Sequence, residues 1–350
     1  MAEGGCKGIF ADSFGHEDYL IRAAKEFPNI QFAHATGTKA HTEKLDNFHN
    51  AFASIYEGRY ISGVAGGMKL NEMINDGKIK KTEAKVGYIG AFPYAEVVSG
   101  YTSFFLGVKS VCESATMDVR YTESWYDEEG EKNAETKLID EDKCVLISQH
   151  ADSPGAPRVC EEKKVPNVFY NIENLDLKES YLASSRIDWR PYFRYFIQNT
   201  QNGEKMDYDW TGNLTNGVVE ILKLGHIAAP DTQDKMDSLI SEIKSGKLKV
   251  FDTSKFTVSK ETPNLIVDSN KHITSYKADV DSDENFTGDT EVVSEGYFHE
   301  SEKRSAPYFD IRIDGINEIL DEPSKIDVSL SAGGICDTSV LLLFLTYLLF

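Results

Sequence analysis

The chain has few of the residue patterns that bind metal ions or form disulfide cross-links. Its five cysteines include no Cys-x-x-Cys pair and show no metal-ligand spacing with the eight histidines. We therefore expect the cysteines to be buried as small hydrophobic side chains. The sequence also contains no Gly-x-Ser-x-Gly elbow, no phosphate-binding P-loop, no Gly-x-Gly-x-x-Gly fingerprint after a strand and no His-Glu-x-x-His motif. Its motifs indicate neither an enzyme class nor a cofactor.

Basic residues are in the minority. The chain of 350 residues has 37 lysines and arginines against 57 aspartates and glutamates, a formal net charge of −20. A surface this negative repels phosphate groups, which argues against nucleic acid and anionic membranes as partners. Because 41% of the residues are hydrophobic, the chain has enough apolar material for a packed core. Its length fits two domains or one large one.

Long hydrophobic runs are missing except at the C-terminus. The start of the chain lacks the apolar core of a secretory signal. The apolar run at residues 340–350 is too short to span a bilayer, which takes about 20 residues. Since small residues precede it, we interpret it as a GPI-attachment signal with candidate anchor sites at Ser331 and Gly333; the alternative is a buried terminal strand or helix. The candidate glycosylation sites Asn213 and Asn285 matter only if the chain is exported.

Apolar strands and amphipathic helices alternate over the first two-thirds of the chain. This alternation predicts a parallel sheet with right-handed crossovers and helices on both faces. After residue 251 the pattern dissolves into short strand-like runs with acidic loops. The sequence predicts strands at residues 7–11, 30–34, 85–90, 118–121, 144–148 and 167–170, and helices at residues 17–26, 50–68, 96–111, 130–139 and 157–163.

Polar and aromatic residues cluster where the predicted strands end. Such clusters occur at residues 13–15, 92–93, 124–127, 149–153 and 171–174. Ligands of open parallel sheets bind beyond the carboxyl ends of the strands, so these clusters indicate a ligand site. Aromatic rings with a few carboxylates and amides suit a flat small molecule with polar edges.

Two other features have both a chemical and a structural interpretation. His150 and Asp152 lie together at a strand end and suggest acid–base chemistry, but no nucleophile or metal partner can be assigned to them. We therefore expect Asp152 to hydrogen-bond a ligand and His150 to cap or pack. The glycine-rich segment at residues 63–67 lies in a helix pattern, where we expect it to allow close packing rather than to bind phosphate.

A series of segments resembles, in the same order, the basic membrane protein family. Members of this family are substrate-binding proteins of ABC transporters, similar to the purine-nucleoside receptor lipoproteins of bacteria. The resemblance extends over residues 6–255. The segments are IFADSFG (residues 9–15), AAKEFP (23–28), FAHATG (32–37), YEGRYISGVAG (56–66), KVGYIGAFP (85–93), SWYD (124–127), QHADSP (149–154) and WRPY (189–192).

The resemblance implies an α/β fold of the type I periplasmic-binding-protein kind. In this fold two doubly wound lobes are joined by hinge crossovers and close on a ligand, with no catalysis and no cofactor. The expected division is a first lobe of residues 1–92 and 186–222, a second lobe of residues 93–185 and 223–255, an acidic C-terminal extension of residues 256–330 and an apolar tail of residues 331–350.

Two departures from the family accompany this division. Family members carry two further strand–helix units before Lys7, so the resemblance implies a first lobe that is truncated at its N-terminus and has an exposed sheet edge. The acidic extension exceeds the family's usual end, and residues 304–312 within it are a candidate for the last hinge-crossing strand.

The resemblance also assigns residues to the cleft between the lobes. One or two rings among Phe14, Trp125 and Trp189 would stack on a purine-like base, while Asp152 would accept a hydrogen bond from an N–H of that base. The implied ligand-binding residues are Ser13 and Phe14 from the first lobe, Phe92 at the first crossover, Trp125, Asp152, Ser153 and Asn171 from the second lobe, Trp189 at the second crossover, and Trp210.

The implied function is that of an extracytoplasmic solute-binding protein. It would bind a purine base or nucleoside and deliver it to the membrane subunits of an ABC transporter, or serve in sensing at the cell surface. A secretory signal would have been lost with the N-terminus, and the apolar tail would attach the chain to the membrane.

The alternatives are a receptor-like domain, GPI-anchored or otherwise membrane-attached, that signals to a protein partner, and a truncated remnant that binds nothing. An enzyme such as a nucleoside hydrolase would need a paired-aspartate metal site, which the sequence does not show.

Overall fold

Two parallel sheets, which we call the small and the large sheet, form the framework of the protein. The computed structural model describes residues 1–12, 14–172, 176–280 and 290–320. The small sheet has the order β1 (Gly8–Ala11), β2 (Gln31–Ala35), β3 (Phe48–Ala53) and β9 (Asp209–Gly212), and its pairs are parallel. The large sheet has the order β10 (Val219–Ile221), β8 (Tyr181–Ile187), β7 (Asn167–Tyr170), β6 (Leu146–His150), β4 (Lys85–Gly90), β5 (Thr116–Tyr121) and β16 (Ile316–Ile319), and is parallel apart from β10.

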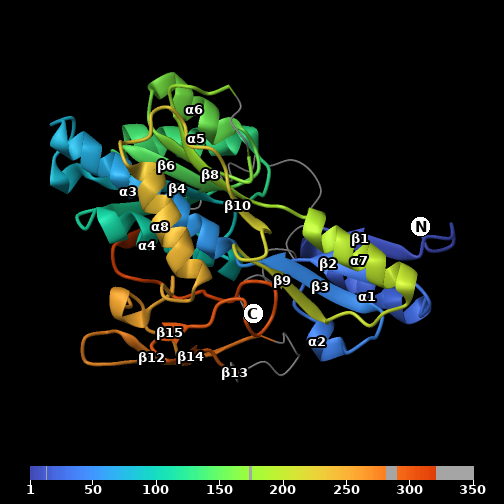
Figure 1. The fold of residues 1–350 in the computed structure, drawn as a ribbon. Helices are drawn as coiled ribbons and strands as arrows, with labels where there is room; N and C mark the ends of the chain where they lie inside the picture. The colour runs from blue at the N-terminus through green and yellow to red at the C-terminus, as the bar shows by residue number, and fades with distance from the viewer. Residues whose placement is uncertain (13, 173–175, 281–289, 321–350) are drawn as a thin grey trace, which may run out of the picture. The chain divides into compact units, whose positions relative to one another are not determined.

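Helices cover both faces of each sheet (Figure 1). On the large sheet, α3 and α4 pack on one face, and α5 and α6 pack on the other. On the small sheet, α1 and α2 pack on one face and α7 on the other. The predicted doubly wound α/β architecture is therefore confirmed. The helices are α1 (Glu17–Glu26), α2 (Ala40–Glu43), α3 (Ile55–Asn75), α4 (Ala95–Val111), α5 (Glu128–Asp140), α6 (Gly155–Lys163), α7 (Arg190–Asn202) and α8 (Thr232–Lys244).

Strand β3 was not predicted from the sequence, which placed the start of a helix at residue 50. In the structure β3 lies inside the small sheet between β2 and β9, and all its residues are buried. Its polar residues conceal the strand in the sequence, and His49 among them is hydrogen-bonded by neighbours. His49 hydrogen-bonds through Nδ1 to the carbonyl of Asp207 at 2.9 Å and through Nε2 to Gln31 Oε1 at 2.8 Å. A strand buried on both faces also shows no alternation of apolar and polar residues.

The chain leaves the small sheet after β3, earlier than the expected first-lobe boundary at residue 92. Helix α3 packs on the face of the large sheet, and β4 pairs with β5 and β6 in that sheet. The reason lies in the helix itself, because buried residues occur all around α3 and require partners on several sides. Residues 55–90 therefore lie with the large sheet, whereas β9 returns to the small one.

Glycines allow α3 and α4 to approach each other closely. A Cβ atom added at Gly63 would lie 2.0 Å from the carbonyl oxygen of Phe104, and one added at Gly107 would lie 2.0 Å from the carbonyl oxygen of Tyr60. Each helix thus presents a glycine to the backbone of the other. The segment at residues 63–67 serves close packing, as the sequence predicted.

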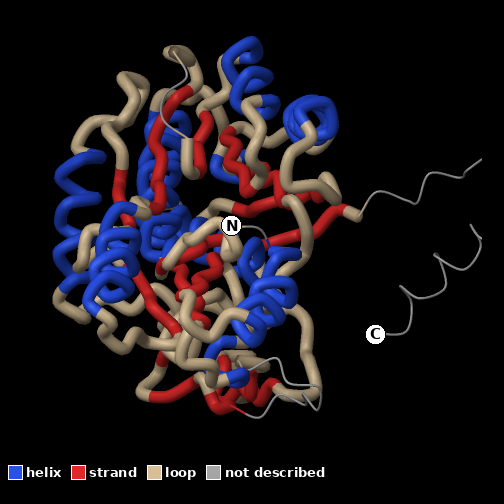
Figure 2. Tube along the Cα trace, turned by 90° about the vertical axis from the view of Figure 1, so that its right-hand side faces the viewer, coloured by secondary structure: helices blue, strands red, loops and turns tan. Residues whose placement is uncertain are grey.

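Residues 256–319, which we call the C-terminal segment, are part of the same folded unit as the sheets. They contain a small antiparallel sheet of β11 (Leu265–Val267), β12 (Ile273–Ala278) and β13 (Thr290–Glu291), and a hairpin of β14 (Val293–Ser294) and β15 (Tyr297–Phe298). Both Figure 1 and Figure 2 show these short strands at the opposite end from α5 and α6. The candidate hinge strand at residues 304–312 forms no strand; β16 instead adds to the edge of the large sheet beside β5.

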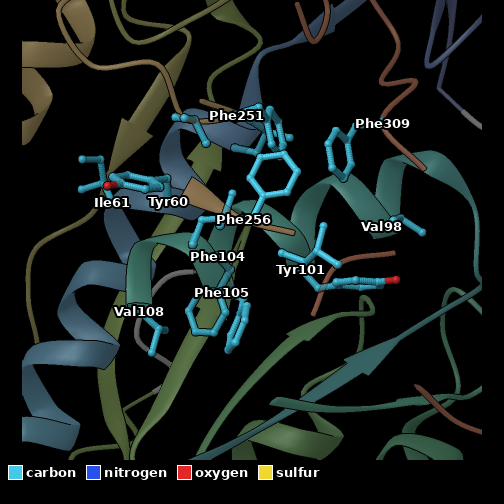
Figure 3. Packing of buried hydrophobic residues seen from close by; sticks show 14 of the residues in the cluster. Tyr60, Ile61, Val98, Tyr101, Phe104, Phe105, Val108, Phe251, Phe256 and Phe309 are labelled. Carbon is cyan, nitrogen blue, oxygen red and sulfur yellow. The ribbon is translucent and has the colours of Figure 1, made fainter. Parts of the chain in front are cut away.

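Aromatic rings join the C-terminal segment to the rest of the core. The ring of Phe309 stacks on that of Phe251 with centroids 4.4 Å apart, and Phe298 meets Phe309 edge to face at 4.8 Å. These rings lie in the same cluster as Phe104 and Tyr101 of α4 (Figure 3). The described part of the expected acidic extension therefore packs on the core.

The other sequence features are placed as follows. Cys112, Cys144 and Cys160 are buried and unbridged, as expected of small hydrophobic side chains, and Cys6 is half-buried. Asn213 is half-buried in a loop, where its Oδ1 accepts a hydrogen bond from the backbone N–H of Asn216 at 3.0 Å. Among the residues that the structure describes, no helix has both the length and the apolar character needed to cross a bilayer. Asn285, Ser331, Gly333 and the apolar run at residues 340–350 lie outside the described residues.

Three carboxyl groups lie largely out of contact with water, and this raises their pKa values. Desolvation raises the pKa of Glu135 to about 8; this carboxylate accepts a hydrogen bond from Cys160 Sγ at 2.9 Å. Desolvation also raises the pKa of Glu57 and of Glu300 to about 7. Glu300 accepts hydrogen bonds from the backbone N–H groups of Tyr308 and Phe309, which oppose the increase. All three groups bind a proton more readily in the folded than in the unfolded chain.

The α3–α4 contact predicts different effects for two glycine-to-alanine substitutions. The G63A substitution forces a methyl group against the backbone of α4, so we expect the free energy of unfolding to fall by about 1–3 kcal/mol. The matched variant G66A meets only the side chains of Leu146 and Val108, at 3.5 Å or more, and gains helix propensity, so its stability should be unchanged or rise by up to about 1 kcal/mol. Urea unfolding measures both. Equal stability of the two variants would contradict the close contact at Gly63.

The buried carboxyl groups predict that stability falls as the pH rises. For Glu135 the stabilisation is complete below the unfolded-state pKa near 4.5 and is lost as the pH rises through the folded-state value of about 8. Between pH 5 and pH 8 the ionisation of Glu135 alone should lower the free energy of unfolding by up to about 3 kcal/mol. The E135Q variant is neutral at every pH, so its free energy of unfolding should depend less steeply on pH. An unchanged slope would show that Glu135 does not contribute.

Candidate ligand-binding site

A cavity of about 530 Å³, which we call the inner compartment, opens where strands of both sheets end. Its walls come from the carboxyl ends of β1, β2 and β3 on one side and of β6, β7 and β8 on the other. Loops that follow parallel strands meet at one edge of a sheet, which explains why residues far apart in sequence converge here. The lining residues are Phe10, Asp12, Gly15, Ala35, Thr36, Phe52, Glu96, Trp125, His150, Asp152, Tyr170, Asn171, Ile187, Trp189 and Phe193.

Aromatic rings form much of this lining. The indole of Trp189 lies 5.8 Å from the ring of Phe10 and 6.3 Å from that of Phe52, centroid to centroid. On the large-sheet side, His150 lies 4.3 Å from Tyr170 and 6.4 Å from Trp125. A flat ligand would therefore find π-faces on both sides.

Asp152 supplies an acceptor at the carboxyl end of β6. Its backbone N–H donates to the carbonyl of Trp125 at 2.9 Å, which fixes the loop. The side chain is exposed to the cavity, yet desolvation by the surrounding walls raises its pKa; His150 opposes this increase and Glu96 adds to it. An ionised carboxylate here accepts hydrogen bonds from ligand N–H or O–H groups.

Asn171 supplies a donor at the end of β7. The residue has a left-handed backbone (φ 55°), which asparagine tolerates well. Its Oδ1 accepts a hydrogen bond from the N–H of Ile187 at 3.1 Å, and its own N–H donates to the carbonyl of Ser185 at 2.9 Å. Because Oδ1 is engaged with the backbone, the amide offers its Nδ2 hydrogens to a ligand.

A buried arginine supports the floor of the cavity. Arg59 of α3 is fully buried, and its guanidinium donates to the carbonyl of Phe169, to Tyr88 Oη and to Ser148 Oγ at 2.8–3.2 Å. The Cζ atom of Arg59 also lies 5.1 Å from the centroid of the Tyr170 ring. This cation–π contact supports a ring that lines the cavity.

His150 lies beside this floor and is almost fully buried. Its ring is held close to α4 because Gly100 has no side chain; a Cβ there would lie 2.6 Å from His150 Nδ1. Its Nε2 lies 3.6 Å from Glu96 Oε1. Within the described residues, no three histidine, cysteine, aspartate or glutamate side chains lie together in a way that could hold a metal ion.

The structure brings together four of the residues that the sequence assigned to the cleft and separates others from them. Trp125, Asp152, Asn171 and Trp189 all line the inner compartment. Phe92 lies next to the lining, 5.7 Å from Trp125, and stacks on Tyr94. Ser153 is buried beneath the loop, where its Oγ accepts a hydrogen bond from the N–H of Gly155 and its own N–H donates to Glu131. Trp210 packs against Tyr192 between β9 and α7, with ring centroids 5.0 Å apart. Phe14 begins a short 3-10 helix (Phe14–His16), and Ser13 lies outside the described residues.

Sequence reasoning missed several lining residues. Phe10 and Phe52 lie at the ends of β1 and β3, but β3 was not recognised, and Phe10 was assigned to a strand without a role. Glu96 was assigned only to a helix. A signal was available for Arg59, since an arginine in an otherwise apolar helix face must find buried acceptors.

The chain matches known proteins over most of its length. A family model described as ABC transporter substrate-binding protein PnrA-like matches residues 1–254. A Brucella abortus protein named as purine-binding is 32% identical over 254 residues, 72% of this chain and 67% of that protein. A Haloferax volcanii protein named as an ABC transporter glucose-binding protein is 30% identical over 257 residues, 73% of this chain. The chain spans 61% of the length of this Haloferax relative.

Solved structures share the fold at low sequence identity. A solute-binding protein of an ABC transporter system from Aeropyrum pernix has a TM-score of 0.60 at 13% identity and covers 71% of this chain and 78% of its own. One from Conexibacter woesei has a TM-score of 0.56 at 20% identity, covering 71% and 80%. These likenesses establish the type I periplasmic-binding-protein fold alone, because a fold hosts many functions.

The family match confirms the resemblance seen in the sequence. The matched region contains both sheets, apart from β16, and every described residue that lines the inner compartment. The family consists of solute-binding proteins for ABC transporters, not enzymes. The chain therefore belongs to the PnrA-like family of ABC transporter substrate-binding proteins.

Proposed function

We propose that the protein is the solute-binding component of an ABC-type uptake system and that its inner compartment binds a purine base or nucleoside. It would act on the extracytoplasmic side, where such proteins collect solutes, and its macromolecular partner would be the membrane subunits of the transporter. The observation that carries the proposal is the combination of converging rings with Asp152 and Asn171 in one cavity.

The rings favour a flat aromatic ligand over a sugar. Trp189, Phe10 and Phe52 lie on one side of the cavity, and Trp125 and Tyr170 lie on the other. Stacking of a base on an aromatic side chain contributes roughly 1–3 kcal/mol. A second ring on the opposite face would add to that contribution.

The polar groups complement the edge of a purine. The Watson–Crick edge of adenine or guanine presents an N–H donor beside a ring-nitrogen or carbonyl acceptor. The Asp152 carboxylate can accept from an exocyclic amino group or ring N–H, while Asn171 Nδ2 can donate to a ring nitrogen. The name of the Brucella relative, a purine-binding protein, supports this choice. The name of the Haloferax relative, a glucose-binding protein, makes a sugar the ligand to test against it.

A thermal-shift and calorimetry panel tests the ligand class. The panel is adenine, adenosine, guanosine, inosine and glucose; a ligand at about 100 times its Kd should add about 2.7 kcal/mol to the free energy of unfolding. We expect purines to raise the melting temperature. The D152N variant should lose about 10–100-fold in affinity, because it removes a charge-assisted hydrogen bond. The exposed α8 variant D234N should bind like the wild type. A response to glucose alone would contradict the proposal.

Tryptophan fluorescence tests the position of the site. The chain has three tryptophans, of which Trp125 and Trp189 line the cavity and Trp210 lies between β9 and α7. We expect a purine to quench the emission, with W125F and W189F each losing part of the quench and W210F retaining it. Loss of the quench in W210F alone would place the ligand at β9 and contradict the assignment to the inner compartment.

A further inference from the structure

The C-terminal segment brings a serine, a histidine and a glutamate into one line of hydrogen bonds, which we call the Ser–His–Glu relay. Ser294 Oγ lies 2.7 Å from His299 Nε2, and His299 Nδ1 lies 2.8 Å from Glu302 Oε2. The relay lies beyond residues 1–254, the region that the family model matches. None of the three residues lines the inner compartment or the adjoining cavity of about 750 Å³, whose wall the C-terminal segment partly forms. The relay is therefore independent of the proposed ligand site.

The β14–β15 hairpin places the serine and the histidine on one face. Ser294 of β14 pairs with Tyr297 of β15, and the N–H of His299 donates to the carbonyl of Val292 at 2.8 Å, which continues the hairpin outward. Residues two apart on a strand point to the same face, so Ser294 and His299 are diagonal neighbours across the pair. Phe298, which lies between Tyr297 and His299, points the other way and is buried in the core.

The carboxylate determines which nitrogen of the imidazole carries the hydrogen. A carboxylate can only accept a hydrogen bond, so Nδ1 of a neutral His299 donates to Glu302. Nε2 is then the bare nitrogen, which accepts the hydrogen bond from the Ser294 hydroxyl. A serine nucleophile needs this pattern, in which a base receives the hydroxyl proton and a carboxylate holds the base in the correct tautomer.

Contacts outside the relay hold its parts in place. The Tyr308 hydroxyl accepts a hydrogen bond from the N–H of Glu302 at 3.2 Å and donates one to the carbonyl of His299. At the hairpin turn, the carbonyl of Gly296 accepts hydrogen bonds from the N–H and the Oγ1 of Thr253, at 2.9 and 3.1 Å. The relay is therefore positioned by groups that take no part in it.

The serine is accessible and has hydrogen-bond donors beside it. Ser294, Glu295 and Gly296 are exposed, and the two turn residues have left-handed backbones, with φ of 52° and 81°. Within the described part of the chain, the N–H groups of Glu295 and Gly296 have no hydrogen-bond partner. The N–H that follows a nucleophilic serine commonly stabilises the negative charge that develops on the attacked carbonyl oxygen. A carbonyl compound that reaches Ser294 thus meets a hydroxyl, a base and free donors.

We propose that Ser294 is an activated nucleophile that aryl esters acylate. Its Oγ forms a bond to the ester carbonyl carbon while the hydroxyl proton moves to His299 Nε2. The bond from that carbon to the aryl oxygen then breaks, and this oxygen takes the proton from Nε2 and leaves as a phenol. The product is an O-acyl serine. His299 is the base and Glu302 is a positioning residue; the acylation is a covalent modification and requires no turnover.

Mass spectrometry of the protein treated with p-nitrophenyl acetate, followed by peptide mapping, tests the proposal. We expect the wild type to gain an acetyl group on Ser294 and the S294A variant to gain none there. H299Q should slow the acylation of Ser294 at least about 100-fold, because it removes the base. E302Q should slow it at least about tenfold, because it releases the tautomer. The control is Ser254, another exposed serine, whose Oγ donates to Asp252 Oδ1 at 2.7 Å and not to an imidazole; S254A should leave the acylation of Ser294 unchanged.

Two further measurements distinguish a reactive relay from hydrogen bonds that only support the hairpin. The melting temperature shows that each variant folds, and E302Q should keep it because the Glu302 side chain is 49% exposed. Nitrogen NMR of the histidine ring reports the tautomer; we expect hydrogen on Nδ1 of His299 in the wild type and a loss of this preference in E302Q. Acylation of Ser294 no faster than that of Ser254, or an unchanged rate in a folded H299Q variant, would overturn the proposal. Hydrogen on Nε2 in the wild type would overturn the role of Glu302.

Discussion

The close contact between α3 and α4 determines where the other parts of the molecule lie. Gly63 and Gly107 let each helix reach the backbone of the other, so the two helices form one rigid layer under the large sheet. Only Ser54 separates the last residue of β3, in the small sheet, from the start of α3, so this helix connects the two sheets. A side chain at either glycine would clash with the backbone of the other helix.

Helix α3 carries the groups that define the base of the site. From it Arg59 reaches the carbonyl of Phe169 and two hydroxyls of β4 and β6, behind the ring of Tyr170. Glu57 accepts a hydrogen bond from the N–H of Leu214 in the loop after β9. Tyr56 meets the ring of Phe251 at 5.3 Å, next to the aromatic cluster of the C-terminal segment. The floor of the site, the loop after β9 and Phe251, on which the C-terminal segment packs, thus all contact α3.

The C-terminal segment has a corresponding role at the mouth of the site. Its aromatic rings place it on the core, and Glu300 holds the backbone at Tyr308 and Phe309. This arrangement gives the cleft a wall that the two sheets alone do not provide. This wall lies beyond residues 1–254, the region that the family model matches.

The family resemblance, not a local pattern, assigned Trp189 to the predicted cleft. The sequence alone determined the alternation of strands and helices, the packing role of the glycines near residue 63, and the position of Trp125, Asp152 and Asn171 where predicted strands end. These are local patterns, and the rule that parallel strands end at one edge converts them into a shared location. Only the tertiary structure decided that residues 48–53 form a strand, that Phe10, Phe52 and Glu96 line the cavity, and that residues of the C-terminal segment wall the cleft. Those outcomes depend on long-range partners: His49 needs Gln31 and Asp207, Arg59 needs Phe169, and Ser305 needs Asp209. No local pattern names such partners, because they become neighbours only when the two sheets and the C-terminal segment pack together.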